Sequence, residues 1–282
     1  MAFATLNSYE VSQKIADSLI SELRQKFLEL VAKNPELYYD KDIEKIKSKN
    51  WSIQRFLNHH KSNVDKALDG LDSAMKWRKS FGVLELSEKD FPREVFQSAP
   101  LFLYGKDLNG AQLMIMRGKV TRKIKSWIPM AQKFFIYLIE KADLADSGKG
   151  VTLLLDCKES GIKNADIDFM KFAHHIFNDY YPGLVNAGLV YKLPTVMEAV
   201  FKVVKSWLNE EQEKFCYMIS KKTINEYVSA NELPDFLLGT NAEPYRNVPD
   251  GSPTAHELAE RLGIKTEKAD KLVKHLEQFY TI

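Results

Sequence analysis

The residues best able to form a metal or catalytic site are two pairs of adjacent histidines. This adjacent spacing argues against a metal site. His174 and His175 are adjacent, so on a helix their side chains point about 100° apart and cannot share a metal ion. His59 and His60 have the same spacing. We therefore predict no metal and no cofactor, and metal-dependent catalysis is excluded as a working hypothesis.

The remaining reactive residue types also lack a catalytic pattern. Asp166 and Asp168 form a D-x-D pair, which capping of a helix N-terminus explains. Cys157 has no histidine pattern to activate it, and the chain contains no H-E-x-x-H, G-x-S-x-G or P-loop motif. We predict that the protein is not an enzyme.

A run of cations followed by an aromatic residue is the first feature that suggests binding. The basic segment (residues 117–125) has five cations and no acidic residue. One interpretation is a solvated loop. The other is contact with an anionic membrane surface, where each cation contributes about 1 kcal/mol and an aromatic side chain prefers the interface. The residues proposed for this contact are Arg117, Lys119, Arg122, Lys123, Lys125 and Trp127.

Residues 195–208 predict an unusually apolar helix. Its polar stripe is narrow, with Glu198, Lys202 and Lys205 at helical spacing. A helix that packs on a sheet with one side only does not need so much apolar surface. Either the helix is a sandwiched core helix, or it covers an apolar cavity and meets a membrane. In the second interpretation it is a gate helix, with Val196, Met197, Val200, Phe201, Val203, Val204, Trp207 and Leu208 as its apolar residues.

Hydrophobic periodicity predicts an α/β protein with a helical beginning and a small helical end. Residues 1–96 read as helices, and residues 97–248 alternate strands with helices, which is typical of a mixed or parallel sheet flanked by helices. Residues 249–282 read as a linker and a helical hairpin. We expect the last segment to be an appendage of the sheet domain.

Several motifs in order resemble the CRAL-TRIO lipid-binding family. They extend over about two thirds of the chain. The motifs are Arg55-Phe56-Leu57, Val64-Asp65-Lys66-Ala67, Trp77-Arg78-Lys79, a strand ending in Asp156, Tyr180-Tyr181-Pro182, the helix that follows Pro194, and Leu233-Pro234 with Gly239.

This resemblance implies a lipid cavity that opens at a membrane, in a cytoplasmic protein peripheral to membranes, with endoplasmic reticulum contacts as one location. The expected ligand is a hydrophobic lipid such as a phospholipid. Gly183 and Phe215 stand where phosphoinositide-exchanging members have an acidic and a basic residue, so we expect a mainly apolar contact. The predicted pocket residues are Leu113, Ile115, Phe134, Leu138, Leu153, Leu155, Ile176, Val190, Phe215 and Tyr217.

The alternative is a non-transferring scaffold whose protein partner binds residues 254–280. Helices with helix-turn-helix spacing are predicted there, but acidic and basic residues are mixed along the second one. The whole chain has 40 Lys and Arg against 38 Asp and Glu, so there is no basic excess for nucleic acid. We predict a lipid or a protein partner and no nucleic acid.

Overall fold

The N-terminal region is a set of packed helices with its own core. The computed structural model describes residues 15–145 and 149–280; the beginning of the helix predicted over residues 8–33 lies outside them. The helices are α2 (Asp17–Lys33), α3 (Asp40–Ser48), α4 (Trp51–His59) and α5 (Val64–Phe81). Leu23, Phe27, Ile53 and Leu71 are among the residues buried between them.

The boundaries of α5 follow from its sequence. The Asn63 side chain accepts a hydrogen bond of 3.0 Å from the Lys66 backbone N–H, which caps the first turn. Gly82 ends the helix in the left-handed region, with φ of 78°, which glycine adopts without strain. Local sequence signals, Asn63 before the helix and Gly82 after it, thus predict both of its ends.

The sheet has five strands in the order β1-β2-β3-β4-β5. Their bounds are Leu101–Lys106, Gln112–Arg117, Val151–Asp156, Val185–Tyr191 and Cys216–Ile219. β1 and β2 form an antiparallel hairpin, and the other neighbours are parallel. The predicted mixed α/β sheet is confirmed.

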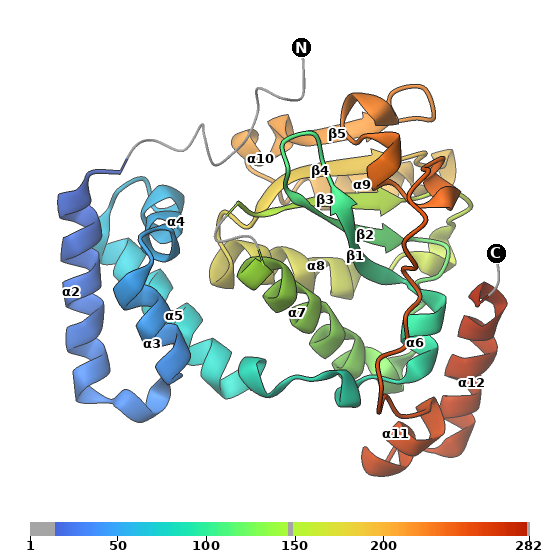
Figure 1. Ribbon diagram of the computed structural model, residues 1–282, viewed down its shortest axis with the longest axis horizontal. Helices are drawn as coiled ribbons and strands as arrows, with labels where there is room; N and C mark the ends of the chain where they lie inside the picture. Colours follow the sequence, from blue (N-terminus) through green and yellow to red (C-terminus); the bar gives the residue numbers. More distant parts are fainter. Residues whose placement is uncertain (1–14, 146–148, 281–282) are drawn as a thin grey trace.

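Helices cover one face of the sheet. α7 (Ile128–Ala145) joins β2 to β3, and α8 (Ile167–His175), continued by a π turn over Ile176–Tyr180, joins β3 to β4. Figure 1 shows α7 and α8 side by side along the sheet, with α2–α5 at one end of the molecule and α12 at the other. Met114, Phe134, Ile136 and Ile139 belong to the core on this face.

Irregular chain covers the opposite face. Short 3-10 turns at Ile224–Glu226, Ala230–Glu232 and Asp235–Leu237 bring Ile224, Val228, Leu233 and Leu237 against Leu113, Ile115 and Leu189. A Cβ atom at Gly239 would lie 1.7 Å from the carbonyl oxygen of Leu233. The loop can therefore close there only with glycine.

The C-terminal hairpin is part of the main core. α11 (Ala255–Arg261) and α12 (Thr266–Leu276) meet at Gly263, which has φ of 65°. Ala255, Leu258, Ala269 and Leu272 are buried in the same core as α7. The residues predicted to form a partner site thus pack against the body of the protein.

The remaining short elements complete the chain. Three helices differ from expectation: α6 (Arg93–Ser98) and α10 (Glu210–Lys214) were not predicted, and α9 (Glu198–Lys205) is shorter than the helix predicted over residues 195–208. Further 3-10 turns lie at Pro35–Leu37, Val83–Glu85, Glu88–Asp90, Lys125–Trp127, Ile162–Asn164, Thr195–Met197 and Glu277–Phe279. The domain boundaries at residues 96 and 248 stay predictions.

Candidate functional site

The predicted gate helix is the least buried apolar element of the sheet domain. A 3-10 turn at Thr195–Met197 leads into α9, where none of the residues Glu198–Lys205 is buried. Val200, Phe201 and Val204 are half-buried. On the same apolar side, 53% of Val196 and 46% of Val203 are exposed. α9 therefore presents a broad apolar side that is incompletely buried, because residues three and four apart are neighbours on a helix.

The connections of the sheet place α9 on the same face as α7 and α8. Parallel strands that follow one another in order are joined by right-handed crossovers, which lie on one face of the sheet. α9 joins β4 to β5, and it contacts α8. The ring of His174 in α8 also lies 6.1 Å from the ring of Trp207, just beyond the end of α9.

On this face, the sheet between β3 and β5 is incompletely covered. By strand register, Leu153 pairs with Gly188 and Gly188 with Cys216, and Val190 pairs with Met218. Leu153, Leu155, Gly188 and Cys216 are half-buried, and 55% of Met218 is exposed. We call these five residues the apolar strip. Side chains this apolar are normally buried once a helix packs on a sheet.

Aromatic residues of α8 and of the π turn that follows it pack against α7. Phe169, Phe172 and Phe177 are half-buried and each contacts Phe135 of α7 at ring centroid distances of 5.3–6.1 Å. Edge-to-face contacts fix the orientation of these rings. Sequence reasoning missed them, although three phenylalanines within nine residues of one predicted helix were a usable signal.

The predicted pocket residues divide between the two faces of the sheet. Phe134, Leu138, Leu153 and Ile176 lie in or against the core on the helical face, and Leu155 and Val190 share that face by register. Leu113, Ile115 and Tyr217 lie in the core on the opposite face. Phe215 is half-buried just before β5.

The grouping of Leu113 and Ile115 with Leu153 and Leu155 was wrong because of the strand register. Leu113 pairs with Thr152, and Ile115 pairs with Leu154. Since side chains alternate between faces, Leu153 and Leu155 point to the other side. Leu113, Ile115 and Tyr217 therefore cannot line one cavity with the helical face.

The gate residues are also placed differently from the prediction. Met197 is buried, while the side chains of Val200, Phe201, Val204, Trp207 and Leu208 are half-buried. Trp207 and Leu208 lie beyond the end of α9, in the turn before α10. Movement of this helix stays a prediction.

The predicted membrane contact is wrong for two of the residues proposed for it. Arg117 is 0% exposed and Trp127 is 2% exposed. The indole Nε1 of Trp127 donates a hydrogen bond of 2.9 Å to the carbonyl of Lys268 in α12. The C-terminal hairpin covers this tryptophan, so it cannot reach a membrane in this structure.

Acidic residues pair with two more cations of the basic segment. Lys119 lies 3.0 Å from Glu159, and Lys123 pairs with Asp168 and lies 3.6 Å from Asp166. Arg122 and Lys125 are exposed and make no ion pair with any residue in the described ranges. The solvated-loop interpretation thus describes most of this segment.

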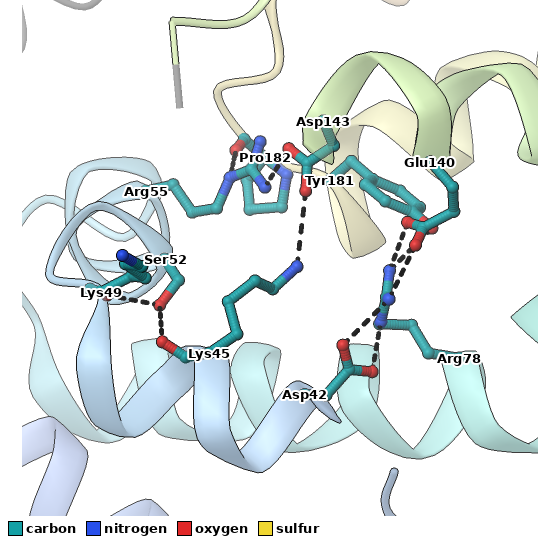
Figure 2. A network of polar contacts seen from close by, with 10 residues as sticks. All are labelled: Asp42, Lys45, Lys49, Ser52, Arg55, Arg78, Glu140, Asp143, Tyr181 and Pro182. Atoms are coloured by element: carbon teal, nitrogen blue, oxygen red, sulfur yellow. Dashed lines mark hydrogen bonds and ion pairs between the residues drawn. The ribbon is translucent and has the colours of Figure 1, made fainter. Parts of the chain in front are cut away.

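A buried polar network joins the N-terminal helices to the sheet domain (Figure 2). Arg78 of α5 is 2% exposed. It donates to Asp42 of α3 at 2.6 and 3.0 Å and to Glu140 of α7 at 2.6 and 2.9 Å. The hydroxyl of Tyr181, which is also buried, donates to Glu140 at 2.6 Å. One guanidinium group therefore connects three helices and the chain entering β4.

A second ion-pair group lies beside the first. Arg55 of α4 donates to Asp143 of α7 at 2.9 Å and to the carbonyl of Pro182 at 2.8 Å, and Lys45 approaches Asp143 at 3.5 Å. Burial would raise the pKa of Asp143, but Arg55 and Lys45 outweigh it and hold that pKa below its usual value. These contacts fix the N-terminal helices on the turn that precedes β4.

The predicted capping role of Asp166 is confirmed, since its carboxylate accepts a hydrogen bond of 3.1 Å from the Phe169 N–H. Burial lowers the pKa of His174, and it raises the pKa of Cys157 to about 12.

Within residues 15–145 and 149–280, no group of three His, Cys, Asp or Glu side chains is placed to hold a metal ion. In the same residues, no helix is long and apolar enough to cross a membrane.

Comparisons with known proteins point to one family. The CRAL/TRIO domain matches residues 96–239, about half of the chain. A CRAL-TRIO domain-containing protein of Schizosaccharomyces pombe is 23% identical over 207 residues; the match covers 69% of this chain and 46% of the relative. This chain thus spans about half the length of that relative.

Two other similarities cover more of both chains. Phosphatidylinositol transfer protein SFH5 of Vanderwaltozyma polyspora is 23% identical over 224 residues, which cover 74% of this chain and 71% of the relative. The crystal structure of Sfh5 superposes with a TM-score of 0.63 at 18% identity, covering 92% of this chain and all of that one. That similarity shows a common fold.

A more specific likeness within the family is predicted from residues 156–162, 166–169 and 199–208. They resemble the CRAL-TRIO domain of motile sperm domain-containing protein 2. None of the relatives reported above tests this likeness, and it stays a prediction.

Proposed function

Because the chain belongs to the CRAL/TRIO domain family, we propose that it binds a hydrophobic lipid between the apolar strip and α9 and transfers it at membranes. The observation that carries this proposal is the incomplete burial of apolar side chains on both sides of that space: Leu155 and Cys216 on the sheet, Val200 and Val204 on the helix. A bound lipid chain would bury these side chains, and this burial would contribute about 25 cal/mol of favourable free energy per Å² of apolar surface.

In this mechanism α9 moves and no bond is broken. An acyl chain leaves the bilayer for a site of similar polarity, so the net free energy is small and the barrier is the opening of the gate. The exposed Val196 and Val203 would contact the bilayer while α9 is displaced. The protein would act on membranes from the cytoplasmic side, with endoplasmic reticulum contacts as one place of action, and would need neither cofactor nor catalysis.

In this proposal the protein makes few polar contacts with the lipid head group. Thr152, the hydroxyl-bearing residue of β3, lies on the other face, where it donates to Asp107 at 2.6 Å. Gly183 is exposed after the Tyr181-Pro182 turn and supplies no charge. We expect the acyl chains to dominate the affinity, with phospholipids sharing similar chains binding alike.

The test compares half-buried and exposed valines of the same helix. Val200→Asp with Val204→Asp should remove lipid that copurifies with the protein, measured by native mass spectrometry and lipid extraction, and should abolish transfer between phosphatidylcholine vesicles. Val203→Asp, the matched control at an exposed position of the same helix, should keep bound lipid and weaken vesicle association.

Absence of lipid binding would favour the alternative function, a scaffold that does not transfer lipid. If the purified wild-type protein carries no lipid, takes up none from vesicles and is indifferent to all three substitutions, the lipid site is refuted. A partner that binds residues 254–280 would then have to displace packing made by Ala269 and Leu272. The present docking of the hairpin does not favour this alternative.

A further inference from the structure

Two arginine side chains come together where the chain leaves the sheet for the C-terminal hairpin. Arg117, at the end of β2, is 0% exposed, and its Nη1 donates to the Ser98 carbonyl at 2.9 Å. Arg246 lies in the segment that descends past β1 to α11 in Figure 1, and its Nη1 donates to the Tyr280 carbonyl at 3.3 Å. This leaves most of each guanidinium group facing the protein interior.

The inward-facing nitrogens of both arginines lack partners. Nε and Nη2 of Arg117, Nε and Nη2 of Arg246, and the hydroxyl of Tyr280 are buried without a hydrogen-bond partner in the part of the chain that the structure describes. Neither arginine makes an ion pair with a carboxylate of those residues within 4.0 Å. Buried guanidinium groups are normally paired, because an unpaired charge is costly to take out of water.

The two positive charges also oppose each other. Arg117 lies over the ring of Phe236 at 4.8 Å, Arg246 over the ring of Tyr245 at 5.0 Å, and the two rings are 5.5 Å apart. Burial lowers the pKa of Arg117, and the charge of Arg246 lowers it further, against the attraction of Tyr245, Asp156 and Asp235. The protein thus holds two cations close together with more donors than acceptors.

We propose that Arg117 and Arg246 form a binding site for a phosphate group. Guanidinium forks match the oxygen geometry of phosphate and donate to it in pairs, and each inward-facing nitrogen would gain an acceptor. The site lies away from the apolar strip, and its ligand would bridge β2 and the segment after residue 240.

The first experiment measures thermal unfolding of the full chain in inorganic phosphate and in sodium chloride at the same ionic strength. Phosphate should raise the Tm by a few degrees and saturate, because a ligand that binds the folded state stabilises it. Arg246→Met should abolish this rise, and it should increase the Tm in phosphate-free buffer since one of two repelling charges is gone. Arg117→Met should behave alike if it folds.

Arg122→Met is the matched control. It removes the same charge from an exposed position near Arg117 and should keep the full response to phosphate. Equal Tm values in phosphate and chloride for the wild type, or an undiminished phosphate response in Arg246→Met, would overturn the proposal.

A second experiment identifies the source of the phosphate group. If it is a lipid head group, vesicles of phosphatidylcholine with phosphatidic acid should bind the protein more tightly than phosphatidylcholine alone, with the difference lost in Arg246→Met and competed by inorganic phosphate. If it is a soluble phosphate ester, Arg246→Met should leave vesicle binding unchanged while the Tm response to phosphate is lost.

Discussion

Replacing Arg78 by methionine should be among the most destabilising substitutions in this protein. Arg78 is the shared partner of Asp42 and Glu140, whose side chains are 4% and 9% exposed. Methionine fills similar volume without charge, so packing is largely kept while two carboxylates lose their counter-ion. Removing one partner from a buried ion pair costs about 3–5 kcal/mol, and we expect this loss in the free energy of unfolding at pH 7.

The loss should depend on pH with a defined sign. Burial would raise the pKa of Glu140, but in the wild type Arg78 outweighs it and holds that pKa below its ordinary value of 4.5. This contributes stability that is present above pH 4.5 and is lost as the pH falls through the folded value. Without Arg78, burial raises the pKa of Glu140 above its value in the unfolded chain. The folded state is then destabilised at any pH at which Glu140 of the unfolded chain is ionised. The difference between variant and wild type should therefore be largest near pH 7 and shrink below about pH 4.5.

The assay is urea unfolding at pH 7 and pH 4, followed by circular dichroism and tryptophan fluorescence. Arg55→Met is a control with a smaller expected effect. Asp143 keeps Lys45 as a neighbour, so the free energy of unfolding should fall only by the contribution of a charged hydrogen bond, about 1.5–3 kcal/mol. Adding Asp42→Asn and Glu140→Gln to Arg78→Met should recover part of its stability. A loss below about 1 kcal/mol, or one equal at both pH values, would refute the role assigned to the buried charges.

Three further predictions concern packing and reactivity. Gly239→Ala should unfold at clearly lower urea concentration than wild type, because its Cβ meets the Leu233 carbonyl; an unchanged midpoint would contradict the loop geometry. Trp127→Ala should loosen α12, seen as faster hydrogen exchange in residues 254–280, while α2 keeps wild-type exchange. Cys157 should resist iodoacetamide at pH 8, because burial and the nearby Asp156 raise its pKa to about 12; mass spectrometry of the alkylated protein measures this, and rapid labelling would show an accessible thiolate.

Local sequence patterns predicted most of the longer helices and strands, because they report local geometry, and they missed the short helices α6 and α10. The uninterrupted apolar run that begins at Val151 and the cap signal at Asn63 predict a strand and a helix near their observed bounds. Local patterns were insufficient for the pocket, since the offset between two parallel strands depends on the crossover helix that joins them. A shift of one residue reverses the face, which is why Leu113 was grouped with Leu153 although it pairs with Thr152.

Charge patterns were misleading for a related reason. The basic segment looks uniform in sequence, but its accessibility is set by residues far along the chain: α12 covers Trp127, and Glu159 neutralises Lys119. The Arg78 network has the same non-local origin, since its carboxylates lie 36 and 62 residues away. Motif resemblance marked Arg78 as notable without indicating its partners.

The remaining free charges lead to a prediction about membrane binding. Of the five cations in the basic segment, Arg122 and Lys125 are exposed and unpaired with the described acidic residues, so its electrostatic contribution should be about 2 rather than about 5 kcal/mol.

Association with the bilayer should then depend mainly on the exposed valines of α9, of which Val203 is 46% exposed. About half of the ~1.5–3 kcal/mol for fully burying a valine is available there, and a carboxylate adds a dehydration cost, so Val203→Asp should weaken vesicle association about tenfold or more. Lys125→Gln, and a rise in ionic strength that shortens the range of charge interactions, should each change it by a few fold. Cosedimentation with phosphatidylcholine vesicles, with and without phosphatidylserine, measures both effects. Strong dependence on phosphatidylserine and salt, together with an indifferent Val203→Asp, would assign membrane contact to the basic segment and remove α9 from that role.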